Sequence, residues 1–213
     1  GYTGGTTVNG GTLVGTTNSL QGDIANNGTV QFNQNFNGTY AGTLSGTGNL
    51  VVVANTGSTG LTLSGTNTFS GGTTVSGIGT LTITSDAALG AVTSGLTLQS
   101  LGTLVFGSSF NLASTRAISI GSGGGRISTN GFDTTISQSI NGPGVFDKHG
   151  AGTLTLTAAN TFSGLGIYGG AVAVSANNQL GSSSTVSLSG GGTLKVGSTF
   201  STVRYLALGS GGG

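Results

Sequence analysis

The 213-residue sequence contains no cysteine, no methionine, no tryptophan and no glutamate, and its one proline is Pro143. The absence of cysteine excludes disulfide bonds and thiolate metal sites together. No apolar run approaches the roughly 20 residues that a membrane-spanning helix needs. Cross-links, thiolate-bound metals and transmembrane helices therefore do not organise this chain.

Charge is also scarce, since charged residues make up only 4% of the chain and the formal net charge is +1. With so few charges and almost no net charge, the chain lacks the basic surface that would attract nucleic acid or an anionic membrane. Glycoside hydrolysis needs two neighbouring carboxylates, and calcium-binding nonapeptide repeats need an aspartate in every turn. The acids are few and scattered: Asp23, Asp86, Asp133 and Asp147. We therefore predict no catalytic residue, no cofactor and no metal site.

Glycine, in contrast, is abundant, with 45 residues. Glycine without a period is typical of low-complexity, disordered chains. Here 34% of the residues are hydrophobic, and they alternate with threonine and serine instead of scattering. A disordered chain usually combines few apolar residues with high net charge, so we expect this chain to fold.

Internal repetition organises the sequence. The stretch LTLSGTNTFSGG, which begins at Leu61, returns as LTLTAANTFSG from Leu154. Further pairs follow in the same order, namely Leu89-Gly90 with Leu180-Gly181 and Arg116 with Arg204, and a shorter copy at the start matches Tyr2–Val8 with Phe69–Val75. The copies cover approximately residues 1–60, 61–153 and 154–213. No shift in composition separates them, so we predict one continuous domain, 1–213.

The finer pattern within each copy predicts strands. Segments of period two, such as LTI, LVF and AVAV, recur between clusters of glycine, asparagine and serine, which is typical of half-buried strands. No window predicts a helix, because glycine and β-branched residues are too frequent. A closed sandwich has no reason to repeat with small changes in length, whereas a solenoid contacts only neighbouring coils. We predict an all-β parallel β-helix of roughly ten coils, at ~20 residues per coil.

One stretch resembles a known family repeat. From Gly142 to Gly164 the chain reads GxGxxxKxGxGTLTLxxxNTFSG. It is similar to the autotransporter-associated β-strand repeat, found in passenger regions of Gram-negative autotransporters. The earlier copies lack the counterpart of Lys148, and residues 164–168 depart from the usual Gly-Thr-Thr-Val. The resemblance implies a right-handed parallel β-helix that is exported across the outer membrane by a C-terminal barrel lying outside this segment.

The ionisable residues that cluster in the sequence are Asp147, Lys148 and His149. A Ser-His-Asp site would need three side chains converging on one oxyanion position. Asp147 and His149 would indeed point to the same side of a strand, but the other copies carry no counterpart of either. We therefore interpret the cluster as a solvated strand end or turn.

Two matched pairs of polar residues suggest structural roles. Arg116 and Arg204 are interpreted as coil-edge arginines that bond a neighbouring carbonyl, with a repeated ligand contact as the alternative. Asn67 and Asn160 are expected to bond their own turn in a left-handed conformation, or to stack into amide ladders.

The aromatic residues Phe69, Phe162 and Tyr2 look like plugs of the core. They are too sparse for a sugar-stacking strip. The glycine-rich stretches 121–125 and 190–192 lack the helix and the Gly-Lys-Ser/Thr ending of a phosphate loop.

Three classes of function follow. The leading hypothesis is a structural stalk or adhesin segment at the bacterial cell surface, able to self-associate or to bind a surface glycan or protein. The alternative is an ice- or glycan-binding face built from Thr-x-Thr rows such as Thr80–Thr82 and Thr153–Thr155. The third is a polysaccharide-degrading enzyme, which we disfavour. In none of these do we expect nucleic-acid binding or membrane insertion by this segment.

Overall fold

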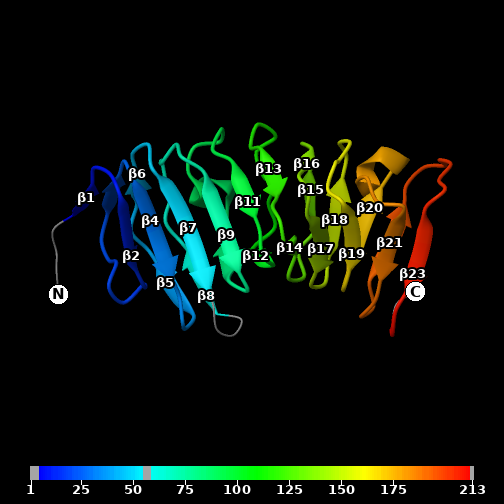
Figure 1. Ribbon diagram of the computed structural model, residues 1–213, viewed down its shortest axis with the longest axis horizontal. Helices are drawn as coiled ribbons and strands as arrows, with labels where there is room; N and C mark the ends of the chain where they lie inside the picture. The colour runs from blue at the N-terminus through cyan, green and yellow to red at the C-terminus, as the bar shows by residue number, and fades with distance from the viewer. Residues whose placement is uncertain (1–4, 55–58, 212–213) are drawn as a thin grey trace.

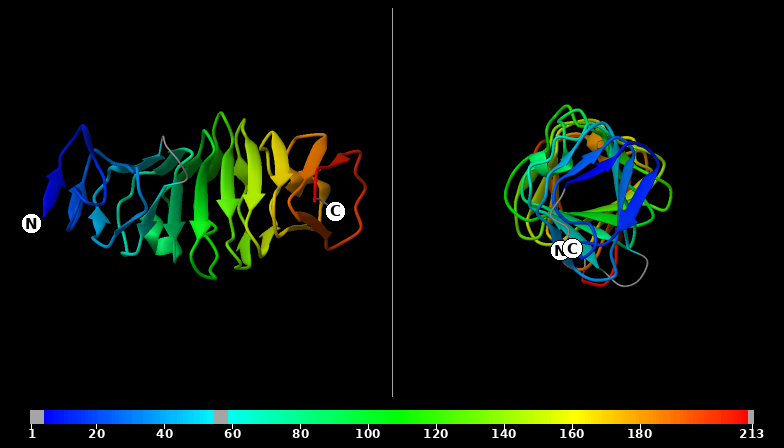
Figure 2. Two further views of the ribbon diagram at one scale, coloured as in Figure 1. Left: turned by 90° about the horizontal axis from the view of Figure 1, so that it is seen from below. Right: turned by 90° about the vertical axis from the view of Figure 1, so that its left-hand side faces the viewer.

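The computed structural model describes residues 5–54 and 59–211. The chain winds into a parallel β-solenoid of about nine turns, with β1 and β23 at opposite ends of an elongated body (Figure 1). Seen along its long axis, the coils superpose into one outline around a single interior (Figure 2, right). The predicted fold class is confirmed, with about nine turns in place of the roughly ten expected.

Four parallel sheets run along the solenoid. The nine-stranded sheet contains β5 (Gly38–Tyr40), β8 (Gly60–Leu63), β10 (Thr80–Ile83), β12 (Gly102–Phe106), β14 (Gly125–Ser128), β17 (Val145–His149), β19 (Gly164–Ile167), β21 (Thr185–Leu188) and β23 (Tyr205–Leu208). The seven-stranded sheet contains β2 (Thr12–Gly15), β4 (Thr29–Asn33), β7 (Asn49–Ala54), β9 (Thr73–Gly77), β11 (Leu96–Leu98), β13 (Ile118–Ile120) and β16 (Ile140–Asn141).

The two smaller sheets complete the wall at either end of the molecule. The three-stranded sheet, near the N-terminal end, contains β1 (Thr6–Val8), β3 (Ile24–Asn26) and β6 (Leu44–Ser45). The four-stranded sheet, nearer the C-terminal end, contains β15 (Thr134–Ile136), β18 (Thr153–Leu156), β20 (Ala171–Val174) and β22 (Thr193–Val196). Each strand is joined to the next strand of its sheet by one full coil of about 20 residues.

Period-two alternation places one side of most strands in the core. Leu81 and Ile83 of β10 are fully buried, whereas Thr80 and Thr82, which alternate with them, are partly exposed. Leu154 and Leu156 of β18 are buried in the same way. Each such side chain contributes about 1.5–3 kcal/mol on full burial, and only when the coils on both sides cover it. The core is therefore a continuous column that neighbouring coils share.

Phenylalanines fill part of this column, as the sequence predicted. Phe69 and Phe162 are fully buried, and the ring of Phe162 lies 5.3 Å from that of Phe146 between centroids. Tyr2, which we expected to play the same part, lies outside the described residues.

Two short 3₁₀ helices were not predicted: η1 (Asp86–Leu89) and η2 (Asn177–Leu180). Each ends at a glycine with positive φ, Gly90 at 76° and Gly181 at 77°. A Cβ atom at these glycines would collide with Phe69 or Phe162 of the preceding coil, so glycine is required here twice over.

Candidate functional site

Arg116 lies just before β13 and its side chain is completely buried. Its Nε and Nη2 atoms donate to the two carboxylate oxygens of Asp86, each at 2.9 Å. Its guanidinium also donates to the backbone carbonyls of Ser94 at 2.8 Å and Leu89 at 3.2 Å. The predicted carbonyl contacts are confirmed, and the two-pronged ion pair with Asp86 is an addition that sequence spacing did not show.

Arg116 also sets the charge state of its partner. Burial alone would raise the pKa of Asp86. Hydrogen bonds from Arg116 and from the Ala113 N–H, together with the positive charge of Arg116, outweigh burial and hold that pKa below its ordinary value. Asp86 is therefore an ionised structural partner.

Arg204 repeats this arrangement in the second copy with a neutral partner. Its Nε donates to Asn177 Oδ1 at 2.8 Å, and its Nη2 donates to the carbonyl of Gly181 at 2.6 Å. Its Nη1 donates to the carbonyl of Ser183. Asn177 occupies in η2 the first position that Asp86 occupies in η1. The matched arginines therefore both hold a 3₁₀ helix from the following coil.

Asn67 and Asn160 hold the same helices from the preceding coil. Asn67 Oδ1 accepts the N–H of Leu44 at 2.8 Å, while its Nδ2 donates to the carbonyl of Ala88 at 2.6 Å. Asn160 makes the equivalent bonds with Ile140 and Gln179, at 2.8 and 2.6 Å.

The expectation for these two asparagines was wrong. Neither is among the described non-glycine residues with positive φ, and each bonds coils about 20 residues away instead of its own turn. They lie several coils apart, so they form no amide ladder either. Each amide instead satisfies one backbone donor at the start of β6 or β16 and one backbone acceptor in a 3₁₀ helix. In each copy, an asparagine from the preceding coil and an arginine from the following coil bond the same 3₁₀ helix, so each unit joins three coils; we call it a three-coil clamp.

Lys148 contradicts the interpretation of residues 147–149 as solvated. It lies in register between Ile127 and Ile167 on the inner face of the nine-stranded sheet and is fully buried. Its Nζ donates to the carbonyls of Gly150 at 2.7 Å, His149 at 3.0 Å and Gly169 at 3.1 Å. The aliphatic stem fills the core while backbone oxygens replace water around the ammonium group. Burial lowers the pKa of Lys148 to about 8, and the charge of Asp133 acts in the opposite direction.

Asp147 and His149 do point to the same side, as predicted, and that side is the outer face. Asp147 lies opposite Arg126 of β14, and Arg126 Nε is 3.9 Å from Asp147 Oδ2. The ring of His149 stacks on that of Tyr168, with centroids 5.1 Å apart and planes 20° from parallel. We call Arg126, Asp147, His149 and Tyr168 the outer polar cluster.

Burial controls protonation in the outer polar cluster. It raises the pKa of Asp147 to about 6, although the charge of Arg126 acts in the opposite direction. Burial, then the charges of Arg126 and Lys148, holds the pKa of His149 below its ordinary value. Asp147 Oδ1 and His149 Nε2 make no hydrogen bond within the described residues. The Asp–His contact that orients a catalytic triad is therefore not formed.

The remaining aspartates are far from one another and serve the backbone. Asp23 accepts the N–H of Thr43 at 2.7 Å, and Asp133 accepts that of Thr153 at 2.6 Å. Among the described residues, no three histidine, aspartate or glutamate side chains gather as metal ligands would. Within that same part of the chain, no helix is long and apolar enough to cross a membrane.

Threonine rows are present but short. Thr80 and Thr82 pair with Thr103 and Val105 of the next coil, and Thr103 pairs in turn with Arg126. The outward threonines therefore end after two or three coils.

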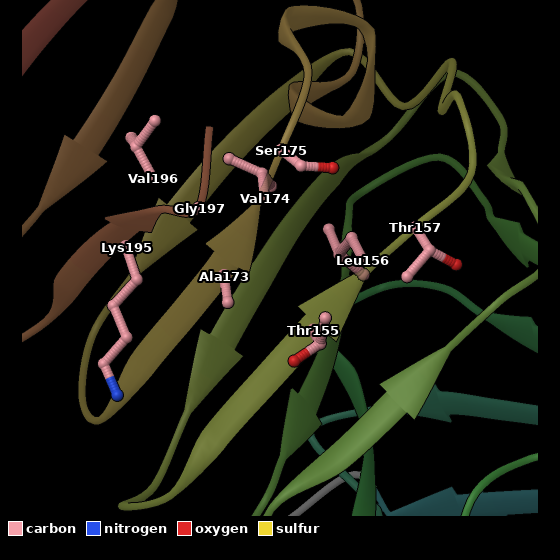
Figure 3. Close-up of a pocket in the computed structure, with 9 residues that line it drawn as sticks. All are labelled: Thr155, Leu156, Thr157, Ala173, Val174, Ser175, Lys195, Val196 and Gly197. Carbon is pink, nitrogen blue, oxygen red and sulfur yellow. The ribbon is translucent and has the colours of Figure 1, made fainter. Parts of the chain in front are cut away.

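A groove of about 350 Å³ crosses the four-stranded sheet. Figure 3 shows Thr155, Ala173 and Lys195 side by side on its neighbouring strands. The Lys195 Nζ donates to Thr153 Oγ1 at 3.1 Å. The groove is lined by Thr155, Leu156, Thr157, Ala173, Val174, Ser175, Lys195, Val196 and Gly197. One cation among aliphatic and hydroxyl side chains offers no acid–base pair for catalysis.

Comparison with known proteins supports the resemblance drawn from the sequence. The comparisons with curated proteins and with solved structures gave no match. The model of the Passenger-associated-transport-repeat family matches residues 1–14, 53–83 and 146–174. The second match contains the TNTFSG copy, residues 66–71, and the third contains the ANTFSG copy, residues 159–164. Three segments of the chain thus match this repeat, which is consistent with an autotransporter passenger.

Proposed function

We propose that this chain is a stalk-forming stretch of an exported autotransporter passenger, displayed at the bacterial cell surface. The observation that carries the proposal is the uninterrupted parallel ladder of the nine-stranded sheet, from β5 to β23, in a chain that holds the passenger repeat in three segments. Most of its charged side chains clamp one coil to the next. A solenoid whose coils are joined in this way is long and rigid, and its uncharged faces are free to contact other molecules.

The seven-stranded sheet is the face we assign to self-association. None of its seven described strands contains a charged residue. Its central outward row is Val14, Gln31, Val51, Thr74, Thr97, Ser119 and Asn141. Two such rows can approach without like-charge repulsion, and many weak contacts add up when the surfaces are long.

Cell aggregation tests this role directly. Bacteria that display the chain should aggregate, and Thr74→Lys with Thr97→Lys should reduce aggregation by placing like charges in the row. Thr62→Lys with Thr82→Lys, which are register partners on the nine-stranded sheet, is the matched control and should leave aggregation unchanged. Equal effects of the two pairs would rule out the seven-stranded sheet as the contact face. Absence of the chain from the cell surface, judged by antibody labelling of intact cells, would rule out the stalk role itself.

A further inference from the structure

The outer polar cluster spans three neighbouring coils on the nine-stranded sheet. Arg126 of β14 lies opposite Asp147 of β17, which lies opposite Gly166 of β19. Tyr168 follows two residues later, and its ring lies over Gly166. A Cβ atom at Gly166 would collide with both Asp147 Oδ1 and the Tyr168 ring. Glycine at this position therefore brings the aromatic ring against the charged pair.

Arg126 differs from the other described cations in having no hydrogen bond. Arg116, Lys148 and Arg204 are each held by several carbonyl groups, and Lys195 bonds a threonine hydroxyl. The contact that Arg126 makes is the 3.9 Å approach to Asp147, which is longer than a hydrogen bond. Its side chain is 31% exposed, and its Nε atom is buried without a hydrogen-bond partner among the described residues.

Tyr168 adds an apolar platform to this cation. Its side chain is 42% exposed while its ring stacks on His149. Hydroxyl groups flank the platform on both sides, because Ser128 lies opposite His149 and Ser187 lies opposite Gly166. A guanidinium, the Asp147 carboxylate beside it, an exposed ring and two hydroxyls thus occupy one outer surface.

We propose that the outer polar cluster binds a carboxylate-bearing saccharide, that is, a uronic-acid residue of an acidic glycan. The planar guanidinium of Arg126 matches a carboxylate with two parallel hydrogen bonds. The Tyr168 ring presents an apolar face to the C–H side of the sugar ring, and Ser128 and Ser187 bond its hydroxyls. The short span of three coils fits one or two sugar units.

Titration with trigalacturonate tests the site, using the 213-residue chain and following binding by calorimetry and by NMR shifts. Saturable binding is expected, with shifts at Tyr168 and Ser128. Arg126→Gln should weaken binding by about ten-fold or more, which corresponds to about 1.4 kcal/mol. Tyr168→Ala should also weaken it. Lys195→Gln, which removes the same charge from the four-stranded sheet, should stay within about two-fold of the parent.

The fully methyl-esterified trisaccharide separates the carboxylate from the sugar ring. It should bind at least about ten-fold more weakly than the acid. Equal binding of ester and acid would overturn the proposed ligand class. Equal behaviour of Arg126→Gln and Lys195→Gln, or no binding at millimolar sugar, would overturn the site. Circular dichroism of each variant confirms that the fold is kept, and the stalk role is untouched by either negative result.

Discussion

Single buried side chains in this molecule hold backbone groups of neighbouring coils by several hydrogen bonds at once. Arg116 bonds one carboxylate and several carbonyls from a completely buried position. Replacing it by glutamine leaves Asp86 without its charge partner inside the wall of the solenoid. Removing one partner of a buried ion pair leaves the other charge without compensation, so we expect the free energy of unfolding to fall by about 3–5 kcal/mol. Urea unfolding followed by circular dichroism measures it.

The second copy supplies the control for this prediction. Asp86→Asn reproduces the neutral pair that Asn177 and Arg204 form naturally. The Asp86→Asn variant keeps a hydrogen-bond acceptor in place, so we expect its free energy of unfolding to fall by only about 1 kcal/mol. If Arg116→Gln proved no more harmful than Asp86→Asn, the ion pair would contribute nothing beyond its hydrogen bonds.

The pKa of Asp147 predicts a pH dependence of folding. The folded chain keeps this proton up to about pH 6, whereas the unfolded chain releases it near the ordinary value of 3.8. Between these values the unfolded state binds fewer protons, so the contribution of Asp147 to stability is lost as pH rises from about 4 to 6. The difference in unfolding free energy between the parent and Asp147→Asn should therefore change across this window. A constant difference would contradict the raised pKa.

At the scale of elements, the clamp asparagines are expected to matter more than any exposed asparagine. Asn67→Ala leaves the N–H of Leu44 and the carbonyl of Ala88 without partners. Each buried unsatisfied group costs about 1–3 kcal/mol, so we expect the free energy of unfolding measured by chemical denaturation to fall by about 2–6 kcal/mol. Asn18→Ala, at an exposed position, should lie within about 0.5 kcal/mol of the parent.

Strand β18 offers a test of inward against outward positions. Leu154→Ala removes a fully buried side chain and should cost about 2–5 kcal/mol. Its effect should reach β15 and β20, the register partners of Leu154, as a loss of hydrogen-exchange protection. Thr155→Ala, one residue along on the outer side, should change stability by less than about 0.5 kcal/mol. Comparable losses for both variants would contradict the assigned orientation.

The strands were predictable from the sequence, and the 3₁₀ helices were not, for one physical reason. Alternation of LTL or AVAV is a local signal, because each residue reports its own side of the sheet. The helix at Asp86–Leu89 has no side-chain cap of its own and depends on Asn67 and Arg116 from the coils before and after it. Lys148 escaped prediction similarly, since its three carbonyl partners include Gly169 from the next coil.

At the scale of the whole molecule, stability should vary along the axis. Coils in the middle are covered on both sides, whereas β23 pairs only with β21 and all its residues are exposed. Since each coil gains its burial from its neighbours, hydrogen-exchange protection should be greatest in β10, β12 and β14 and fall toward both ends. Uniform protection from β1 to β23 would indicate a single cooperative unit instead.

The buried cations have a consequence for the lifetime of the chain outside the cell. A trypsin-like protease must draw a lysine or arginine into its specificity pocket, and the chain has five such residues in all. Arg116 and Lys148 are fully enclosed, and Arg204 is held by three neighbouring residues. The groups that lock the coils together are thus the groups such an enzyme would need to reach. Folding itself withdraws most of the cleavage sites.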